Sequence, residues 1–483
     1  MRNAEPARSD IGIPTQLCCP LEMRHPLRAA PLLLLIFLGA LSAQPHWKAG
    51  TAAFDITPQQ PLWMAGYGAR TNVAQGTAQP LWIKALALED QRAQRGLILS
   101  TDTLGIPQSI HSNVTKRLQH ELNLEPRQMM LHASHTHCGP VLRRALYDAY
   151  PIASPEIARI EQYSNQLEER IVSTVKEAFS RLAPATLFAS SGQTRFAINR
   201  RNNLEEQVPT LIATQALKGP VDHAVPVLSV RDPRGVLKAV VFGYACHNTT
   251  LSFYQWCGDY AGFAQSTLEK SHPGALAMFF MGCGADQNPL PRRELRLAER
   301  YGNMLASAVE ETLLGPQDNL EPELRSSMES IPLPLGPAPT REELKQMSAG
   351  PAGGTTRWAS RLLAELEAGR SFPRHYDYPV QVWKLGARQW WFALGGEVVV
   401  DYALRFKKEH GESTWIAAYC NDVMAYIPSE RVLREDMPPR ANPRWGYEGN
   451  TSMYVYGFPA HRWAEGIEDR IAASIRRQTE ALR

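Results

Sequence analysis

From residue 49 to the end of the chain, short apolar runs of strand length alternate with longer runs whose apolar residues recur at helical spacing. This alternation favours an α/β domain built on a mixed sheet. The chain of 483 residues is interpreted as a single large domain with a mixed β-sheet core and flanking helices. The predicted strands are 81–89, 96–101, 128–134, 186–190, 225–230, 237–245, 275–281, 380–385, 389–394 and 415–420. The predicted helices are 108–122, 155–182, 264–271, 294–314, 399–410 and 461–482.

One break interrupts this alternation. The stretch 331–339 is rich in proline, and two short predicted helices follow it, at 341–347 and 357–366. Strands resume at residue 380. We interpret 331–370 as an excursion on the surface of the domain, and a linker between two domains is the alternative.

Residues 23–43 have the three parts of a secretory signal peptide: a basic start, an apolar middle and a small-residue cleavage site ending at Ala43. The apolar middle is short for a bilayer span, so an uncleaved anchor is the less favoured alternative. The sequence therefore predicts an exported protein, periplasmic or secreted, with a mature domain at 44–483. Residues 1–22 resemble no targeting element and are interpreted as an N-terminal extension, with Met23 as the alternative start of translation.

Charge and cysteine content exclude several kinds of partner and site. The net charge is +3 and no long basic or acidic run occurs, so no nucleic-acid partner is expected. Five cysteines follow the predicted cleavage site without any C-x-x-C pair, which argues against a cysteine-built zinc site. An odd number in an exported protein leaves at least one thiol free or paired to another chain. Cys246 and Cys257 are close enough in sequence to close a short disulfide loop.

Three histidines lie within six residues of one another at the end of a predicted strand. His132, His135 and His137 follow an apolar run, and Gly139 and Pro140 then break the chain. Side chains two apart on a strand share a face, so His135 and His137 can point the same way. Two converging imidazoles suit a metal ion, or one metal ligand beside one acid/base. A polar turn with histidines bonded to the backbone is the alternative.

Other polar residues also follow predicted strands directly. His247 ends one strand, and Glu397 comes after another strand and two glycines. An acid at the end of an apolar strand needs a partner, either a metal ion or the N-terminus of the helix predicted just after it. Because several such clusters follow strands, we expect them to converge on one edge of one sheet. The remaining members are Asp259, a candidate N-cap, Asp286 in a glycine-rich turn, Asn421, Tyr426 and Tyr447.

Taken in order over about 400 residues, these stretches resemble the neutral/alkaline ceramidase family of zinc-dependent amide hydrolases. The motifs that carry the resemblance are F-D-I-T-P and M-A-G-Y-G near the predicted mature start, S-H-T-H-C-G-P, I-N-R at 198–200, A-C-H-N at 245–248, G-D-Y-A-G-F at 258–263, L-G-G-E at 394–397, C-N-D-V-M-A-Y at 420–426 and Y-E-G-N-T-S at 447–452.

The resemblance implies a role for each matched residue. The implied Zn²⁺ ligands are His135, His247, Glu397 and Tyr426. His137 takes the place of the acid/base, and Arg200 and Tyr447 match residues that contact the scissile amide. Supporting or turn roles are expected for Asp259, Asp286 and Asn421, and His132 is interpreted as structural.

The resemblance also implies a reaction and a substrate class. The reaction is hydrolysis of an amide bond, with zinc-bound water as the nucleophile. The substrate is a lipid amide such as ceramide or another small molecule with an amide bond. Peripheral contact with a membrane is expected through a lipid substrate.

Two departures from the family pattern bear on these expectations. The family carries a catalytic serine after the strand that ends at Met281, whereas Gly282 stands there in this chain. The neighbouring Cys283 is then the candidate for a substitute nucleophile. Long family members add a C-terminal immunoglobulin-like domain, which is not expected here because the chain ends with the predicted helix 461–482.

Four other functions are alternatives to this one. A non-catalytic, zinc-stabilised binding protein on the same fold is one alternative, and a metallo-hydrolase for a non-ceramide amide or ester is another. A metallo-β-lactamase-like hydrolase is disfavoured because Cys138 and Gly139 stand where such folds expect Asp-His. A serine hydrolase is disfavoured because no G-x-S-x-G occurs.

Overall fold

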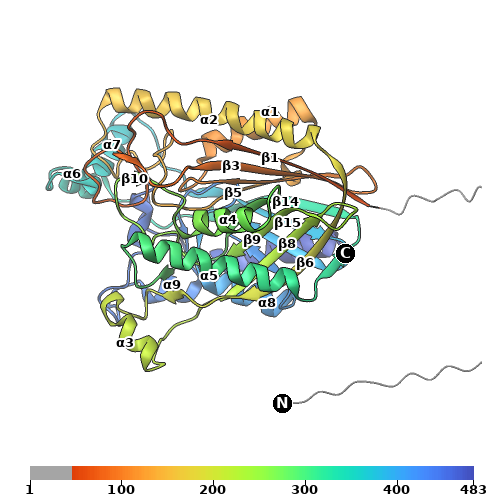
Figure 1. Ribbon diagram of the computed structural model, residues 1–483. Coiled ribbons are helices and arrows are strands. Elements are labelled where there is room, and N and C mark those ends of the chain that lie inside the picture. Colours follow the sequence, from red (N-terminus) through yellow and green to blue (C-terminus); the bar gives the residue numbers. More distant parts are fainter. Residues whose placement is uncertain (1–45) are drawn as a thin grey trace, which may run out of the picture. The chain divides into compact units, whose positions relative to one another are not determined.

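The computed structural model describes residues 46–483, which lie within one compact unit. The predicted extension 1–22 and signal peptide 23–43 are outside the described residues. The fold is of the mixed α/β class, as the sequence predicted (Figure 1).

The larger sheet has nine strands with parallel and antiparallel pairs. The parallel pairs are β11 with β9 and β4 with β5, at the two ends of the strand order. The sheet curls so that the Ser100 hydroxyl of β4 donates a hydrogen bond to the Phe279 carbonyl of β11 at 2.6 Å. In order, the strands are β11 (Leu276–Met281), β9 (Leu237–Tyr244), β8 (Ala224–Arg231), β6 (Ala183–Gln193), β1 (Trp47–Asp55), β3 (Trp82–Glu89), β4 (Arg95–Thr101) and β5 (Met129–Ala133), with β13 (Asp318–Leu320) on β6.

A second sheet packs against the inner face of the first. Its order is β14 (Leu324–Pro334), β15 (His375–Leu385), β16 (Gln389–Leu394) and β18 (Trp415–Ala417). Trp383 and Trp391 of this sheet share a buried cluster with Ile98 and Met130 of the larger one. Three two-stranded pairs complete the strands: β10 (Gln255–Trp256) with β2 (Gly76–Thr77), β12 (Gln287–Pro289) with β7 (Ala197–Asn199), and β17 (Glu397–Val398) with β19 (Tyr426–Ile427).

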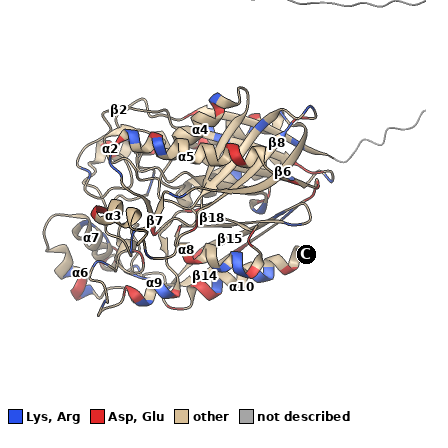
Figure 2. Ribbon diagram, turned by 60° about the horizontal axis from the view of Figure 1, so that its bottom comes forward, with Lys and Arg blue, Asp and Glu red and all other residues tan. Residues whose placement is uncertain are grey.

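Helices cover the outer faces of both sheets (Figure 1). Helix α2 (Ser154–Ser180) packs on β1 and β3, with α1 (Gln108–Leu122) beside it, whereas α4 (Asp259–Ser271) and α5 (Leu295–Leu314) pack over the β8, β9 and β11 side of the sheet. Helices α8 (Val400–His410) and α10 (Ile467–Ala481) cover the second sheet. Charged residues of both signs lie on these outer helices (Figure 2). The shorter helices are α3 (Val208–Ala213), α6 (Arg341–Ser348), α7 (Gly354–Glu367) and α9 (Glu430–Glu435).

Burial on both faces explains why most strands read as continuous apolar runs. In β4, Leu97 and Leu99 face α1 and α2, while Ile98 faces the second sheet. The sequence missed β1 and β14 because these strands alternate buried and exposed residues instead. Strand β14 lies at an edge of its sheet, where Pro332 and Pro334 are tolerated. The stretch that begins at 331 therefore starts inside a strand.

The remainder of that stretch forms α6 and α7, which pack on each other around Trp358. Trp358 Nε1 donates to the Phe458 carbonyl at 2.6 Å, and Arg361 contacts the Gly457 carbonyl at 2.8 Å. The helix pair thereby supports the loop that carries Tyr456. Across residues 46–483, every helix is too short or too polar to cross a bilayer.

Candidate metal centre and its surroundings

His135 and His137 lie just beyond β5, where the chain turns sharply. His135 has a left-handed backbone (φ 58°), and its Nδ1 lies 2.7 Å from the Leu104 carbonyl oxygen. His137 Nε2 lies 3.2 Å from His135 Nε2. Both rings are buried. The turn therefore brings the two imidazoles together in the interior. The expected alternation along a strand is not the cause, because both residues lie beyond the end of β5.

His247 reaches the same place from the end of β9. Its Nδ1 lies 2.8 Å from the Gly284 carbonyl oxygen, in the loop after β11. Nitrogen atoms of His135, His137 and His247 all lie within 4.8 Å of one another. Three buried histidines from two strand ends thus form one cluster that suits a metal ion.

A short parallel ladder places Glu397 directly beside Tyr426. The two residues are register partners in β17 and β19. Glu397 Oε2 lies 3.2 Å from His135 Nε2 and 3.1 Å from His247 Nε2. The Tyr426 hydroxyl lies 3.4 Å from His247 Nε2. All four residues assigned as ligands by the resemblance are therefore neighbours in space.

The hydrogen bonds show that this set fits a cation. A carbonyl oxygen only accepts, so His135 and His247 must each carry their proton on Nδ1. Burial, followed by the charge of Arg200, lowers the pKa of His247 to about 4, so this ring is neutral near pH 7. Its Nε2 lone pair then faces the Glu397 carboxylate, which is unfavourable unless a positive ion lies between them. The donor set of two imidazoles, a carboxylate and a phenol oxygen fits zinc.

Burial alone would favour the neutral acid form of Glu397, whereas positive charge at His135 and His247 would lower its pKa well below the usual range. Because the His247 ring is neutral, a cation between these groups is the source of such positive charge. Burial, together with His135 and His247, also holds the pKa of His137 well below the usual range. His137 Nδ1 has no hydrogen-bond partner among the described residues. The site therefore contains an ionised carboxylate and a neutral imidazole that has one ring nitrogen unused.

Arg200 and Tyr447 lie on the side of the cluster that opens to solvent. The β7–β12 pair holds the chain at Arg200, whose backbone N–H donates to the Asp286 carbonyl at 2.9 Å. Its guanidinium donates to Tyr426 Oη at 3.2 Å and to Glu448 Oε1 at 2.9 Å, and lies 5.8 Å from the Tyr447 ring centre. Tyr447 is 42% exposed. The predicted amide-contacting residues therefore adjoin the predicted metal ligands.

A surface depression of about 310 Å³ lies beside Arg200, which contacts the predicted metal ligand Tyr426. Arg200, Tyr447 and Glu448 form one wall, and Leu204, Leu290 and Trp445 contribute apolar surface.

The expected supporting residues fix loops around the centre. Asp286 Oδ1 accepts from Val400 N–H at 2.9 Å, so this acid, and not Glu397, serves the start of α8. Asp259 begins α4 without capping it, and its Oδ2 accepts from Leu251 N–H at 2.8 Å. The Asn421 side chain accepts from Leu131 N–H at 3.1 Å. Each residue ties a site loop to a neighbouring element.

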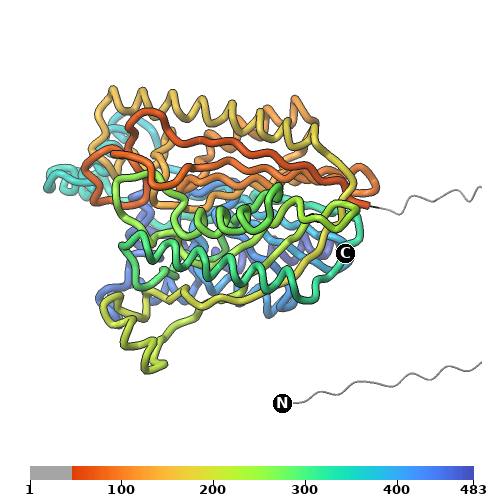
Figure 3. The backbone as a smooth tube through the Cα atoms, viewed as in Figure 1, coloured from red at the N-terminus to blue at the C-terminus, as the bar shows by residue number. Residues whose placement is uncertain are grey.

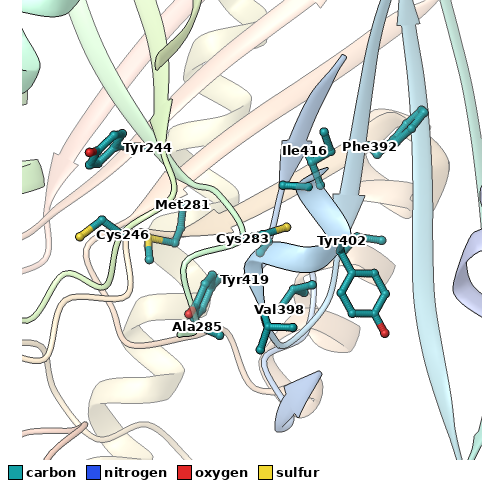
Figure 4. Close-up of a cluster of buried hydrophobic side chains, with 14 of the residues drawn as sticks. Tyr244, Cys246, Met281, Cys283, Ala285, Phe392, Val398, Tyr402, Ile416 and Tyr419 are labelled. Carbon is teal, nitrogen blue, oxygen red and sulfur yellow. The ribbon is translucent and has the colours of Figure 1, made fainter. Parts of the chain in front are cut away.

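Two residues of the sequence analysis, Cys283 and His132, lie away from the candidate metal centre. Cys283 is fully buried among Val398, Tyr402 and Ile416, and burial raises the pKa of its thiol well above the usual value (Figure 4). His132 lies between the two sheets, with Nδ1 3.0 Å from Cys420 Sγ. All five cysteines in the described part of the chain are free, so the Cys246–Cys257 disulfide is not formed.

The predicted site residues do meet, but they do not meet at one edge of one sheet as the sequence predicted. Through the chain of pairings, β5 runs opposite to β9 and β11, and Glu397 follows a strand of the second sheet. The centre therefore forms where the curled larger sheet meets the smaller one.

Three tyrosines at the centre were missed from the sequence. The Tyr456 hydroxyl donates to Glu397 Oε1, and Tyr419 Oη lies 3.4 Å from Glu397 Oε2. The Tyr67 ring lies 4.7 Å from the His137 ring. Tyr67 belongs to the M-A-G-Y-G motif, which was a usable signal, whereas nothing in sequence distinguishes Tyr456 from the other tyrosines.

The N-terminal half of the chain is similar in sequence to known proteins. Residues 47–282 match the family described as neutral/alkaline non-lysosomal ceramidase, N-terminal. The chain is 26% identical over 227 residues to a neutral ceramidase of Pseudomonas aeruginosa, which covers 46% of this chain and 33% of that protein. It is 25% identical over 245 residues to neutral ceramidase B of Dictyostelium discoideum, covering 48% of this chain and 33% of the relative. The matches thus span about a third of the length of these relatives.

Solved structures extend the likeness beyond the matched segment. A structure described as ceramidase complexed with C2 has a TM-score of 0.65 at 17% identity, over 90% of this chain and 76% of that one. The neutral ceramidase of Pseudomonas aeruginosa has a TM-score of 0.65 at 19% identity, over 86% and 72%. Segment 47–282 of this chain thus carries the N-terminal sequence pattern of the neutral/alkaline non-lysosomal ceramidase family, and the similarity of fold extends beyond that segment.

Proposed function

We propose that this protein is a zinc-dependent amidohydrolase that cleaves the amide bond of a lipid such as ceramide. The observation that carries the proposal is the convergence of His135 Nε2, His247 Nε2 and the Tyr426 hydroxyl around Glu397. Such a set of electron donors calls for a cation in the space between them. The names of the matched relatives support ceramide as the first substrate to try.

The residues that would hold the zinc ion are His135, His247, Glu397 and Tyr426. When bound, zinc supplies Lewis acidity, which polarises a carbonyl group and makes water more acidic. His137 is placed to move a proton: its neutral ring lies beside the ligands and has Nδ1 unpaired. We assign it removal of a proton from the attacking water and delivery of that proton to the departing amine.

Arg200 and Tyr447 have a separate task in the proposed reaction. Negative charge develops on the carbonyl oxygen of an amide as it is attacked, and preorganised donors stabilise that charge. Both side chains line the depression, and Glu448 holds the Arg200 guanidinium in place at 2.9 Å. The nucleophile in this scheme is a water molecule, because Gly282 has no side chain and Cys283 lies in the core.

Metal analysis and activity measurements test the proposal together. Purified protein is expected to hold one zinc ion per chain, and His247→Ala to lose most of it. His272→Ala is the matched control, because that histidine is partly exposed and pairs with Glu310. A panel of fluorogenic N-acyl amides, with and without a chelator, then reports hydrolysis. Full zinc occupancy in a variant lacking both His135 and His247 contradicts the ligand assignment, and zinc without hydrolysis favours a binding protein.

We also propose export, with cleavage near Ala43. The basic, apolar and small-residue parts of 23–43 support it. N-terminal sequencing of secreted or periplasmic material is expected to begin near Gln44. An intact apolar run on membrane-bound protein contradicts this proposal.

A further inference from the structure

Arg201, the residue after Arg200, is a buried cation that joins two distant parts of the chain. Its side chain is only 1% exposed. It follows β7, whereas its acidic partners lie in segment 435–448, from the end of α9 onward. The two segments lie side by side in the fold, yellow-green against blue (Figure 3). A guanidinium in the interior needs such partners, because an unpaired buried charge is strongly unfavourable.

The guanidinium of Arg201 donates hydrogen bonds in two directions at once. Its Nη1 donates to Glu448 Oε2 at 2.7 Å, and its Nη2 donates to Asp436 Oδ1 at 2.8 Å and to Glu435 Oε2 at 3.0 Å. Asp436 is itself fixed, because its other oxygen accepts from the Gly449 N–H at 2.7 Å. Arg201 therefore ties Glu448 to the end of α9.

Glu448 is shared between Arg201 and Arg200, one of the predicted amide-contacting residues. Its Oε1 accepts from Arg200 Nε at 2.9 Å, while its Oε2 accepts from Arg201. Arg200 in turn donates from Nη2 to the Tyr426 hydroxyl at 3.2 Å. An unbroken line of hydrogen bonds thus joins the end of α9 to a predicted metal ligand.

We propose that Arg201 is a positioning residue for amide hydrolysis, acting through Glu448 to hold the Arg200 guanidinium beside the candidate metal centre. Arginine suits this task because its planar fork donates along fixed directions, whereas the ammonium group of lysine is a point charge on a flexible stem. Without Arg201, the second oxygen of Glu448 has no fixed donor, and Arg200 loses its defined place. The inference rests on the proposed function for the reaction, but the position of Arg200 is measured without activity.

The variant Arg201→Lys keeps the buried positive charge but cannot donate to Glu448 and Asp436 along two fixed directions. We expect kcat for a soluble N-acyl amide to fall about tenfold, which is less than the roughly 10²–10³-fold cost of losing such a donor outright. KM should stay nearly unchanged, because Arg200 acts on charge that develops only in the transition state.

Arg405→Lys is the matched control for replacing an arginine of an ion-pair network. Arg405 lies in α8 and also has three acidic partners, which are Glu409, Glu468 and Asp469. The control is expected to keep the kcat of the unaltered protein, and thermal unfolding curves and zinc content verify that the variants fold and bind metal alike. If Arg201→Lys does not fold, Glu448→Gln is expected to give the same fall in kcat, since its amide offers one acceptor oxygen to two guanidinium groups.

A double-mutant cycle separates positioning from a general structural effect. If Arg201 acts through Arg200, then Arg201→Lys has little further effect on kcat once Arg200 is replaced by Met. A general structural loss is instead the same in both backgrounds. An equal loss in both backgrounds, or an unchanged kcat in Arg201→Lys alone, overturns the proposal.

A crystal structure of Arg201→Lys provides the test if the unaltered protein hydrolyses no amide. The proposed function then fails, but a displaced Arg200 guanidinium supports the positioning role. An Arg200 guanidinium that still contacts Glu448 and Tyr426 as in the unaltered protein overturns it.

Discussion

The hydroxyl of Tyr456 donates a hydrogen bond to Glu397 Oε1, across a separation of 59 residues in the chain. The other carboxylate oxygen of Glu397 faces His135 and His247 at 3.2 and 3.1 Å. One oxygen is thus held by the phenol while the second is directed to the candidate metal centre. Tyr456 is therefore a positioning residue for the carboxylate.

Replacing Tyr456 by Phe is expected to weaken zinc binding by about 10- to 100-fold, because groups that orient a metal ligand typically contribute this much. Competition with a chelator of known affinity measures the change. Tyr454→Phe is the control: its ring packs near Trp358, with ring centres 6.2 Å apart, and no hydrogen bond links it to Glu397. Equal zinc affinity in the two variants would remove the positioning role.

Gly66 provides space for the ring of His137. Its backbone is left-handed (φ 103°), and a Cβ built on it would lie 2.3 Å from His137 Nδ1. Gly66→Ala must therefore displace the imidazole, and amide hydrolysis is expected to fall about 10²-fold or more, as for loss of a general acid/base. Gly68→Ala in the same motif meets nothing within 4 Å and should retain activity. Comparable kcat values for the two variants would contradict the assigned role of His137.

Sequence patterns predicted most of the fold because most strands are buried on both faces. Helix α1 and strand β16 begin and end where their apolar runs do. Strands β1 and β14 were not predicted, because buried and exposed residues alternate in each of them. Strand β14 lies at an edge of its sheet. The alternation of apolar patterns along the chain therefore identified the α/β class, but not the full set of strands.

Sequence analysis predicted those site residues that lie in motifs at the ends of strands. His135, His247 and Glu397 each follow an apolar strand, so position in sequence marked them. Their convergence from two sheets depends on the curl of the larger sheet, which no local pattern encodes. Tyr456 lies in an irregular segment after η3 (Thr451–Tyr454), where only tertiary packing assigns a partner.

Asp422 is expected to make stability depend on pH. Burial raises its pKa to about 7, against the effect of the hydrogen bond from Tyr376, whereas an unfolded chain has an aspartate pKa of about 3.9. Between these values the folded state holds a proton that the unfolded state has lost. The free energy of unfolding therefore falls as pH rises from about 4 to about 7, by about 1.4 kcal/mol per pH unit within this window.

The variant Asp422→Asn cannot ionise, although its amide oxygen still accepts from Tyr376. Its free energy of unfolding, relative to the unaltered protein, is expected to rise as pH increases from about 4 to about 7. Urea unfolding at several pH values measures the difference. Buried Asp259 and Asp286, whose pKa values burial raises to about 6, contribute a slope of the same sign in both proteins. Parallel stability curves for the two proteins would contradict the assignment to Asp422.

Cys283 is expected to be dispensable for hydrolysis. Its thiol is fully buried, and burial raises its pKa well above the usual value, so little reactive thiolate forms. Cys283→Ala should retain most activity and lose roughly 1 kcal/mol or more of stability through the cavity it leaves. Activity of the purified variant and its urea unfolding curve measure both effects.

Restoring the family serine at Gly282 gives a second test of the same idea. A Cβ at this position would lie 3.0 Å from the Ala245 Cβ, two residues before His247 in the chain, so Ala245 must move by a few tenths of an ångström. Gly282→Ser is therefore expected to lower activity, since it disturbs a predicted ligand without adding a needed nucleophile. If this variant is instead more active, or if mass spectrometry finds an acyl group on Cys283 while Cys283→Ala is inactive, a side chain near this turn takes part in the reaction and water is not the sole nucleophile.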